Sequence, residues 1–322
     1  MSFDYIRNYF DYEFKELDKF INDSLCSDVP LIKDISIYMS SKGGKRIRPL
    51  MTILVAKAFG YKGNDHILLA SVIELIHTAT LLHDDVIDVS EMRRGKFTVN
   101  KKWGNKEAIL SGDFLYTRAF QMMLRINNID IIKIISDATN MLTEGEVIQL
   151  INKGNYNLDE LNYLEIIKRK TAILFQASVS LGALISHVDS DTFNRLYKFG
   201  LHLGIAYQLI DDILDYSSNF ESLGKVIGND FFEGIFTLPF IHAFKNISDD
   251  EKKFLINCFR FKKKNKIQDI KSIIINSKSI DYAFDLAKNE LNIAKECILD
   301  LFDPFYKNLT MCLIDFILNR KI

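Results

Sequence analysis

An apolar run that closes with aspartates stands at residues 79–88, which read Ala79-Thr80-Leu81-Leu82-His83-Asp84-Asp85-Val86-Ile87-Asp88. A second run of the same kind stands far along the chain, where Gly204-Ile205-Ala206-Tyr207-Gln208-Leu209-Ile210 precedes Asp211-Asp212-Ile213-Leu214-Asp215. Residues i and i+4 lie on one face of an α-helix, so the first and last aspartates of each motif point the same way. The spacing therefore predicts two helices that each end in a cluster of carboxylates.

The two acidic motifs together indicate a metal site. If they faced each other, six carboxylates would surround one cavity, which is unfavourable unless cations lie between them. Carboxylate oxygens suit Mg²⁺, which usually keeps several waters and binds through a few carboxylates plus substrate phosphates. We therefore expect a diphosphate held by Mg²⁺ between two helices. The alternative for either motif alone is a solvated helix end.

Composition and periodicity indicate a helical protein. The chain has 322 residues, 48% of them hydrophobic, and contains only four prolines, which are rare in helix interiors. Hydrophobic residues recur with a period near 3.6, and strand-like alternation is scarce. The predicted helices span residues 3–23, 31–41, 48–60, 65–88, 105–126, 130–152, 158–187, 190–216, 234–246, 249–260, 268–275, 280–302 and 305–320. We predict an all-α fold, one large bundle of antiparallel helices around a central active-site cavity, as a single domain over residues 1–322.

Charge and cysteine content limit the possible partners and compartments. The 41 basic and 42 acidic residues nearly balance, so no overall field favours nucleic acid or an anionic membrane. The four cysteines form no CxxC pair, which is typical of reduced thiols in a cytoplasmic protein, and no signal peptide is evident at the N-terminus. Residues 171–188 carry no Asp, Glu, Lys or Arg, but their serines, Gln176 and His187 favour a helix buried on all sides over a membrane span.

A basic stretch offers the cations that a diphosphate needs. It reads Gly43-Gly44-Lys45-Arg46-Ile47-Arg48-Pro49, with Pro49 at an expected helix start. Lys45 and Arg48 can grip phosphate oxygens, Arg48 through its planar fork. A solvated basic turn is the alternative.

Other polar residues lie near the acidic motifs. Arg93 and Arg94 follow the first motif and could fold back over it, or could be a surface pair. His77 lies seven residues before Asp84, about two helical turns, so it is either a phosphate contact or a core histidine. Gln208 has a similar position before the second motif. The remaining candidates are Lys170, Thr171 and Lys225.

Together these pieces resemble the trans-isoprenyl diphosphate synthases, all-α enzymes that extend an allylic diphosphate with isopentenyl diphosphate. The resemblance runs from about Ser41 to Pro239, and the motif sequences look most similar to those of the bacterial octaprenyl type. It includes the basic stretch, Glu74 to Asp85, Met92-Arg93-Arg94-Gly95-Lys96, Gly112-Asp113-Phe114-Leu115, Lys170-Thr171 and Tyr207 to Asp212.

The resemblance implies a fold of the isoprenoid synthase type and a role for each candidate. Six aspartates would hold Mg²⁺, about three ions per active site, and with Lys170 would be catalytic: Asp84, Asp85, Asp88, Asp211, Asp212 and Asp215. The allylic diphosphate, of farnesyl or geranyl type, would contact Arg93, Lys170, Thr171, Gln208 and Lys225. Isopentenyl diphosphate would contact Lys45, Arg48, His77 and Arg94. The resemblance further implies a homodimer and, from the octaprenyl type, the side-chain precursor of a respiratory quinone.

Product length in such enzymes depends on residues shortly before the first aspartate motif. The family places a bulky aromatic residue four or five positions before the first aspartate where growth is blocked, and here these positions hold Thr80 and Ala79. Because both residues are small, the resemblance implies an open apolar tunnel and a long-chain product. Ala79 could instead be a close helix contact only.

The chain departs from the family pattern at three positions. Ile235 replaces a phosphate-binding lysine, Phe97 replaces a small residue or proline, and Tyr207 replaces phenylalanine. One charge-assisted hydrogen bond contributes about 1.5–3 kcal/mol, so the loss of that lysine would weaken the allylic site without destroying it. Ile235 motivates one alternative, a noncatalytic or weak regulatory subunit of a heteromeric prenyltransferase.

Two further alternatives are a class I terpene cyclase, whose second motif is generally of another type, and a structural bundle, which leaves the basic motifs unexplained. Asn319, Arg320 and Lys321, near the C-terminus, could approach the active site, but we expect them to lie in a frayed tail.

Overall fold

The computed structural model describes residues 2–40, 44–217 and 228–320. Over these residues the fold is all-α, as predicted, apart from a small antiparallel hairpin of β1 (Met92–Arg93) and β2 (Lys96–Phe97). The chain forms two compact units. The first comprises Met1–Thr139, Leu174–Gly200 and Cys297–Leu313, and the second comprises Asn140–Ile173, Leu201–Glu296 and Ile314–Ile322. A single domain over the whole chain stays a prediction.

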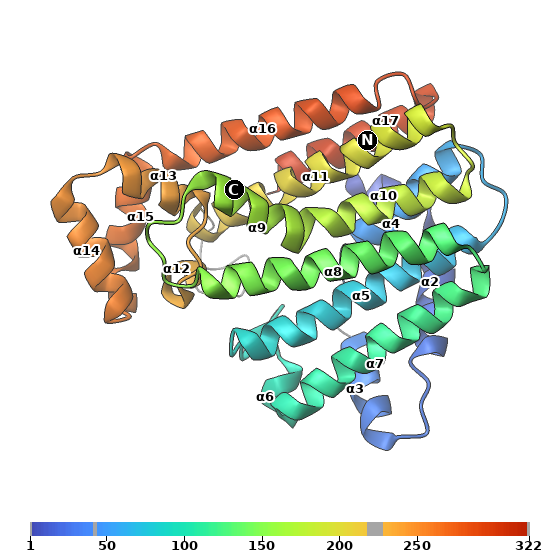
Figure 1. The fold of residues 1–322 in the computed structure, drawn as a ribbon, viewed down its shortest axis with the longest axis horizontal. Coiled ribbons are helices and arrows are strands. Elements are labelled where there is room, and N and C mark those ends of the chain that lie inside the picture. Colours follow the sequence, from blue (N-terminus) through green and yellow to red (C-terminus); the bar gives the residue numbers. More distant parts are fainter. Residues whose placement is uncertain (1, 41–43, 218–227, 321–322) are drawn as a thin grey trace. The chain divides into compact units, whose positions relative to one another are not determined.

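The helices divide between the units as follows (Figure 1). The first unit contains α1 (Phe3–Tyr9), α2 (Asp11–Ser24), α3 (Pro30–Ser40), α4 (Ile47–Ala58), α5 (Asp65–Ile87), α6 (Val99–Trp103), α7 (Asn105–Met123), a 3-10 turn (Leu124–Ile126) and most of α10 (Ile173–Ile185). The second contains α9 (Glu160–Ile167), a π-helical turn (Lys168–Ala172), α12 (Asn229–Glu233), α13 (Leu238–Asn246), α14 (Asp249–Arg260), a 3-10 turn (Lys264–Lys266) and α15 (Ile267–Asn276). Residues of both units occur in α8 (Ile129–Ile151), α11 (Ser190–Ser217), α16 (Ser279–Cys297) and α17 (Pro304–Leu318).

The core of the first unit is built on α4, α5 and α10. Residues 49–56 of α4 and 173–183 of α10 are all buried, so the prediction of a helix buried on all sides is confirmed for α10. The two helices approach closely at Gly182, where a Cβ would lie only 2.7 Å from the carbonyl oxygen of Thr52. The Thr52 hydroxyl in turn donates a 2.9 Å hydrogen bond to the carbonyl of Ser178. This core holds the helix that carries the first acidic motif.

Helix α5 is a long and largely apolar helix of that core. By length and composition alone it could cross a membrane, but 67% of its most apolar window is buried inside the structure. In Figure 1 it runs beside α7. Its burial identifies it as a core helix, which positions Asp84 at its C-terminal end.

The core of the second unit is rich in aromatic side chains. Phe231 packs against Phe236, Phe240 and Phe259, with ring centroids 5.6–6.2 Å apart, and Phe236 stacks on Phe240 at 4.1 Å. Helix α13 begins at a proline-containing first turn, and α14 begins with a capping box in which Ser248 and Glu251 satisfy each other's backbone amides. These contacts support the end of α11, which carries the second acidic motif.

Most predicted helix bounds agree with the structure to within a few residues, and the differences have local causes. The predicted helix 3–23 is two helices separated at Phe10, and the predicted helix 158–187 contains the π-helical turn. The sequence has neither glycine nor proline at these two positions, so pattern reasoning has no signal for them. The short helices α6 and α12 and the hairpin were not predicted.

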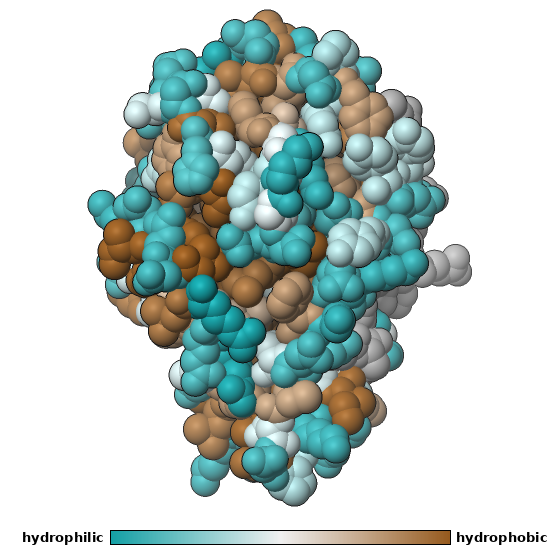
Figure 2. All heavy atoms as spheres, turned by 90° about the vertical axis from the view of Figure 1, so that its right-hand side faces the viewer, coloured by the Kyte–Doolittle hydropathy of each residue, from teal (hydrophilic) through white to brown (hydrophobic). Residues whose placement is uncertain are grey.

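The surface mixes polar and apolar side chains. Figure 2 shows one face on which hydrophilic residues cover most of the area and hydrophobic residues form separate patches between them. Exposed large apolar residues on α7 include Ile109 and Leu110, and those on α8 include Ile129, Val147 and Ile151.

Candidate active site

The first acidic motif lies at the C-terminal end of α5 in the first unit. Its middle residue Asp85 is only 3% exposed, and Nε and Nη2 of Arg93 each lie 2.8 Å from its Oδ1. The hairpin makes this contact possible, because Arg94 and Gly95 between its strands both have positive φ (53° and 74°), as a two-residue turn of type I′ requires. Of the two alternatives that the sequence left open for these arginines, the structure shows that Arg93 folds back onto the motif.

The other two aspartates of the motif have a different environment. Asp84 and Asp88 are half-buried, and the backbone amide of Asp88 donates to the carbonyl of Asp84 at 2.8 Å, one helical turn away. Their side chains share one face of the helix end. The motif therefore separates into a buried, paired carboxylate and two more accessible ones.

A group of basic residues lies in the same unit. Nη1 of Arg48 is 3.3 Å from Nε2 of His77, and the Arg48 guanidinium lies over the ring of Phe175 at 4.6 Å. Burial, followed by the charges of Arg48, Arg94 and Arg93, holds the pKa of His77 well below its usual range, so its ring is neutral at pH 7. A neutral ring has one N–H to donate to an anion and one acceptor nitrogen.

Arg94 and the basic stretch are brought together. A Cβ on Gly44 would lie 2.9 Å from Nη1 of Arg94, so the glycine leaves room for the guanidinium beside the backbone. Lys45, the next residue, is exposed. Of the residues predicted for isopentenyl diphosphate, Arg48 and His77 are thus in direct contact and Arg94 lies against the start of the same loop.

The predicted chain-length positions lie one turn before the motif. Ala79 is fully buried, whereas Thr80 is half-buried and donates a 2.8 Å hydrogen bond to the carbonyl of His77. A large side chain at Ala79 would therefore have to displace its neighbours in the core.

The second acidic motif, on α11 in the second unit, repeats the pattern of the first. Its middle residue Asp212 is 3% exposed and accepts hydrogen bonds from the Tyr163 hydroxyl (2.5 Å) and from Nε2 of Gln208 (2.7 Å). The Thr171 hydroxyl donates to Oε1 of Gln208 at 2.7 Å. Burial, followed by the nearby Asp230, raises the pKa of Asp212 well above its usual range. Asp211 and Asp215, at the ends of the motif, are half-buried.

Lys170 is presented by the π-helical turn between α9 and α10. Such turns occur often at functional sites, because the extra residue displaces side chains from the helical repeat. Gly145 of α8 accommodates the turn, since a Cβ there would lie 2.8 Å from the Lys170 backbone nitrogen. Nζ of Lys170 lies 2.6 Å from Glu146 and 2.7 Å from Oε1 of Gln149.

Arg320 is the functional candidate that the sequence analysis placed wrongly. Its side chain is only 14% exposed, Nη2 lies 3.2 Å from Oδ1 of Asp211, and its guanidinium lies over the Tyr207 ring at 4.4 Å. The expected frayed tail is therefore wrong for this residue. The apolar periodicity of α17 continues to Leu318, two residues before Arg320. That pattern was the sequence signal that Arg320 follows directly on a packed helix. Lys321 lies outside the described residues.

Two predicted positions beyond the second motif remain. Lys225 lies outside the described residues. Ile235 is half-buried, and its backbone amide donates to the carbonyl of Asp230 at 2.8 Å.

The donor chemistry of both motifs fits a hard divalent cation. Each motif supplies two half-buried carboxylates on one face, and carboxylate oxygens are the ligands that Mg²⁺ and Ca²⁺ take. Within the described part of the chain, no three His, Cys, Asp or Glu side chains are already gathered in a metal-binding cluster. Mg²⁺ usually binds through one or two carboxylates together with substrate phosphates, and the half-buried carboxylates of each motif fit that mode of binding.

Comparison with known proteins decides the family. The sequence profile described as polyprenyl synthetase matches residues 29–276, which is most of the chain. The chain belongs to the polyprenyl synthetase family. The matched range is longer at both ends than the resemblance found in the sequence analysis, which runs from about Ser41 to Pro239.

Relatives support the family assignment over the whole chain. This polyprenyl synthetase is 40% identical to the octaprenyl diphosphate synthase of Haemophilus influenzae over 322 residues, covering 100% of the chain and 98% of the relative. It is 46% identical to the octaprenyl diphosphate synthase of Escherichia coli over 235 residues, which are 73% of each protein.

A solved polyprenyl synthase from Caulobacter crescentus, complexed with calcium and isoprenyl diphosphate, matches with a TM-score of 0.95 and 36% identity, covering 100% of this chain and 98% of that one. The fold is therefore the isoprenoid synthase fold. The protein is a prenyltransferase, a long-chain trans-polyprenyl diphosphate synthase of a family that uses a divalent metal and isoprenyl diphosphate substrates.

Proposed function

We propose that this synthase makes an octaprenyl-type diphosphate by Mg²⁺-dependent condensation of isopentenyl diphosphate onto an allylic diphosphate of farnesyl or geranyl type. The product would supply the side chain of a respiratory quinone. The observation that carries the proposal is the repeated arrangement of the two motifs, in which Asp85 and Asp212 are buried and paired. The identity to two octaprenyl diphosphate synthases supports the product length.

The arrangement of each motif favours particular metal ligands. Asp84 and Asp88 share one face, as do Asp211 and Asp215, and these four carboxylates are half-buried, whereas both middle carboxylates are only 3% exposed and are held by side-chain donors. We infer that the outer aspartates bind the metal and that Asp85 and Asp212 hold the helix ends in place. Convergence of both motifs on one diphosphate stays a prediction, supported by the family membership.

The reaction needs electrostatic stabilisation rather than a nucleophilic side chain. The C1–O bond of the allylic diphosphate breaks and its electron pair leaves with the diphosphate, while the double bond of isopentenyl diphosphate forms the new bond to C1. A proton then leaves the adduct to the departed diphosphate. Bound Mg²⁺ would neutralise charge on this leaving group.

The basic residues have two proposed tasks. Arg93 and Lys170 add positive charge beside the allylic diphosphate, and the Lys170 ammonium, now paired with Glu146, would turn to the phosphate when substrate binds. Arg48, neutral His77 and Arg94, with Lys45, would orient isopentenyl diphosphate. The apolar core around α5 excludes water, which would otherwise hydrolyse the allylic cation.

We further propose a cytoplasmic homodimer. The four cysteines include no CxxC pair, and reduced thiols are typical of a cytoplasmic protein. The exposed apolar residues Ile109 and Leu110 on α7 support a partner surface there, because large exposed apolar side chains favour association.

The test is a product assay. Purified protein is incubated with Mg²⁺, labelled isopentenyl diphosphate and farnesyl diphosphate, and the chain length is read by chromatography. A product with about five added units, which carries farnesyl to octaprenyl, is expected. Asp84→Asn should lower the rate about 100-fold, since metal charge stabilisation contributes several kcal/mol, while the exposed control Asp137→Asn should not.

Ile235 favours one second candidate, a weak or regulatory subunit of a heteromeric enzyme. That candidate predicts no product until a second chain is added. A cyclic hydrocarbon from the allylic substrate alone would instead indicate a terpene cyclase. Either result would overturn the proposed synthase.

A further inference from the structure

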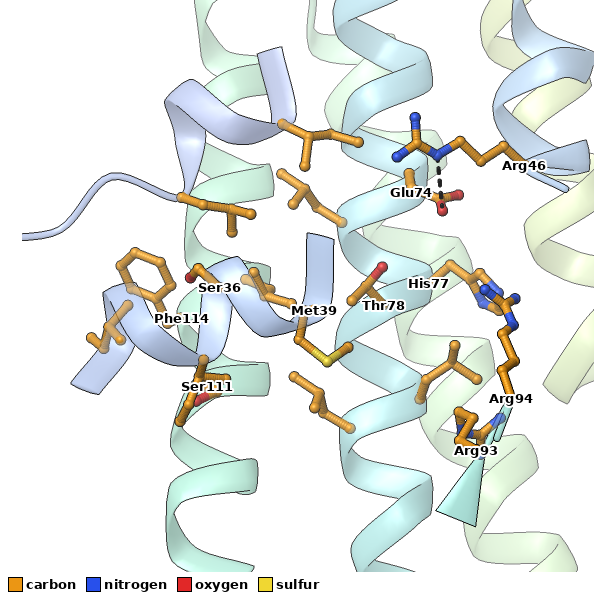
Figure 3. Close-up of a pocket in the computed structure, with 18 residues that line it drawn as sticks. Ser36, Met39, Arg46, Glu74, His77, Thr78, Arg93, Arg94, Ser111 and Phe114 are labelled. Atoms are coloured by element: carbon orange, nitrogen blue, oxygen red, sulfur yellow. Dashed lines mark ion pairs between the residues drawn. The ribbon is translucent and has the colours of Figure 1, made fainter. Parts of the chain in front are cut away.

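Two groups of basic residues in this protein have different surroundings. Those of the first unit line a pocket together with His77, and one of them, Arg46, lies 3.9 Å from Glu74 (Figure 3). That pocket belongs to the proposed isopentenyl diphosphate site. The second group lies on the lysine loop, residues 260–266, which joins α14 to α15 in the second unit (Figure 1). The proposed reaction does not use this loop.

The lysine loop carries a local excess of positive charge in a chain whose formal net charge is −1. Its sequence is Arg260-Phe261-Lys262-Lys263-Lys264-Asn265-Lys266, and all seven residues are exposed. From residue 254 to residue 280 the chain contains seven basic residues and one acidic residue, Asp269. Among the described residues, Lys266 is the one cation of the loop with a carboxylate partner, and it lies 3.1 Å from that aspartate. The other cations therefore add their charges on one exposed surface.

The acidic residues of α14 are too far away to neutralise the loop. Asp249, Asp250 and Glu251 form the first turn of this helix, whereas Arg260 is its last residue. At a rise of about 1.5 Å per residue the two ends are about 16 Å apart, which exceeds the screening length of about 8 Å at physiological salt. The loop is therefore a separate positive surface.

Backbone hydrogen bonds hold the loop in a defined turn. Lys262 has a left-handed backbone (φ 45°), and the amide of the next residue, Lys263, donates to the carbonyl of Cys258 at 3.0 Å. This is the Schellman arrangement, in which the left-handed position is usually glycine. The amide of Lys266 then donates to the carbonyl of Lys263 at 2.9 Å. The lysines are thus gathered on one tight turn instead of being spread along an extended segment.

An exposed aromatic ring lies among these cations. Phe261 is 71% exposed, and Nζ of Lys263 lies 5.7 Å from the centre of its ring. Removal of such a ring from water is favourable, so the complementary surface has apolar depth next to negative charge. Basic residues combined with Phe, Trp or Leu are typical of segments that bind at the surface of an anionic bilayer.

We propose that the lysine loop docks this synthase on an anionic lipid bilayer, with Phe261 inserted at the acyl-chain boundary and the lysines among the phosphate headgroups. The product class supports this partner, because the apolar chain of a long-chain polyprenyl diphosphate is unfavourable in water. A docked enzyme can transfer that chain to the bilayer without passage through bulk water. The docking does not depend on the number of isoprene units.

Flotation of the whole protein with lipid vesicles tests the proposal. One set of vesicles is phosphatidylcholine alone, and in the other about a third of the lipid is phosphatidylglycerol. The wild type is expected to bind the anionic vesicles about 100-fold more strongly. Salt at about 1 M, which shortens the screening length to about 3 Å, should remove most of this preference. Equal binding to the two kinds of vesicle at low salt overturns the proposal.

Charge variants locate the docking surface. The combined change Lys262→Gln, Lys263→Gln and Lys264→Gln should weaken binding to anionic vesicles about 100-fold, since each basic residue near the surface contributes about fivefold. The matched control carries the same change at three exposed lysines of the first unit, Lys19, Lys62 and Lys198. Both variants lose the same total charge, and the control should weaken binding by less than about twofold. A loop variant that binds like the wild type overturns the proposal.

A tryptophan in the loop reports insertion directly. Phe261→Trp should shift its emission to shorter wavelength on anionic vesicles and should be quenched by lipids brominated on their acyl chains. The wild type, whose one tryptophan is Trp103, gives the background. Tyr197→Trp, at a 45% exposed position of the first unit, is the matched control and should not be quenched. Equal quenching at the two positions overturns the insertion of the loop.

Nucleic acid is the other polyanion that the lysines could attract. A DNA duplex is therefore tested at the same phosphate concentration as the anionic vesicles. Binding to the duplex but to neither kind of vesicle would assign the loop to nucleic acid and overturn the membrane proposal. Binding to anionic vesicles that the duplex does not displace supports it.

Discussion

The hydroxyl of Tyr163 donates a 2.5 Å hydrogen bond to Oδ2 of Asp212. Gln208 donates to the other oxygen of the same carboxylate, so both oxygens of this buried group have donors. In the first motif, the corresponding donor is Arg93, which donates to the buried carboxylate of Asp85. In each motif the second aspartate is buried and holds the helix end, whereas the outer pair is half-buried and shares one face of the helix.

Removal of the tyrosine hydroxyl should destabilise the second unit. Tyr163→Phe leaves one buried oxygen of Asp212 without its donor, at an expected cost of about 1–3 kcal/mol in the free energy of unfolding. Urea unfolding measures this cost. Tyr197→Phe, whose ring is 45% exposed, is the control and should cost much less. Equal losses in the two variants would show that Asp212 does not depend on the bond.

Loss of Arg93 should remove a two-pronged ion pair from the buried carboxylate of Asp85. We expect Arg93→Ala to lower the unfolding free energy by about 3 kcal/mol, and Arg93→Lys to recover only part of it, because lysine lacks the fork. Thermal unfolding of both variants measures this, with the exposed Arg125→Ala as control. If Asp85→Asn added to Arg93→Ala restores no stability, the pair is not the cause.

Stability should fall on acidification through His66. This histidine is 1% exposed, and burial lowers its pKa to about 4, below the value near 6.5 of the unfolded chain. Between pH 4 and 6.5 the unfolded state binds more protons at this site than the folded state does. The stability that depends on a neutral His66 is therefore fully present above pH 6.5 and is lost as the pH falls towards 4. Urea unfolding at pH 7.5 and 4.5 measures how much the free energy of unfolding falls on acidification. We expect this fall to be smaller in His66→Phe than in the wild type, by up to roughly 3 kcal/mol. Identical losses would contradict the expectation.

A bulky residue at Ala79 should shorten the product. Ala79→Tyr inserts an aromatic ring at a fully buried position of α5, so we also expect a stability loss of about 1–3 kcal/mol. Chromatography of labelled products measures the length. Thr78→Tyr places the same ring on a different face of α5, about 100° around the helix axis, and should leave the length unchanged. If Ala79→Tyr makes the wild-type product, this position does not limit growth.

A lysine at position 235 should strengthen binding of the allylic substrate. Ile235 is half-buried, and an ammonium there could add one charge-assisted hydrogen bond to the diphosphate. Such a bond is expected to lower the KM for farnesyl diphosphate about tenfold. Steady-state kinetics measures this, with the exposed Ile275→Lys as control. An unchanged KM would mean that position 235 does not reach the substrate.

Local pattern was sufficient for the fold class and for most helix bounds. The period of apolar residues predicts α5 and α11, because helical periodicity depends on near neighbours along the chain. The spacing of Asp84 and Asp88 likewise predicts a shared face. The order of the motifs was enough to recognise the family that the comparisons then showed.

Tertiary contacts decided what each polar residue does. Arg93 lies eight residues from Asp85, Tyr163 lies forty-nine from Asp212, and Arg320 lies 109 from Asp211. The two longer separations exceed the reach of any helical period, so the sequence alone treated all six aspartates alike and placed Arg320 in a tail. Burial makes the difference, because a carboxylate removed from water needs a donor, and only packing determines which carboxylate is removed.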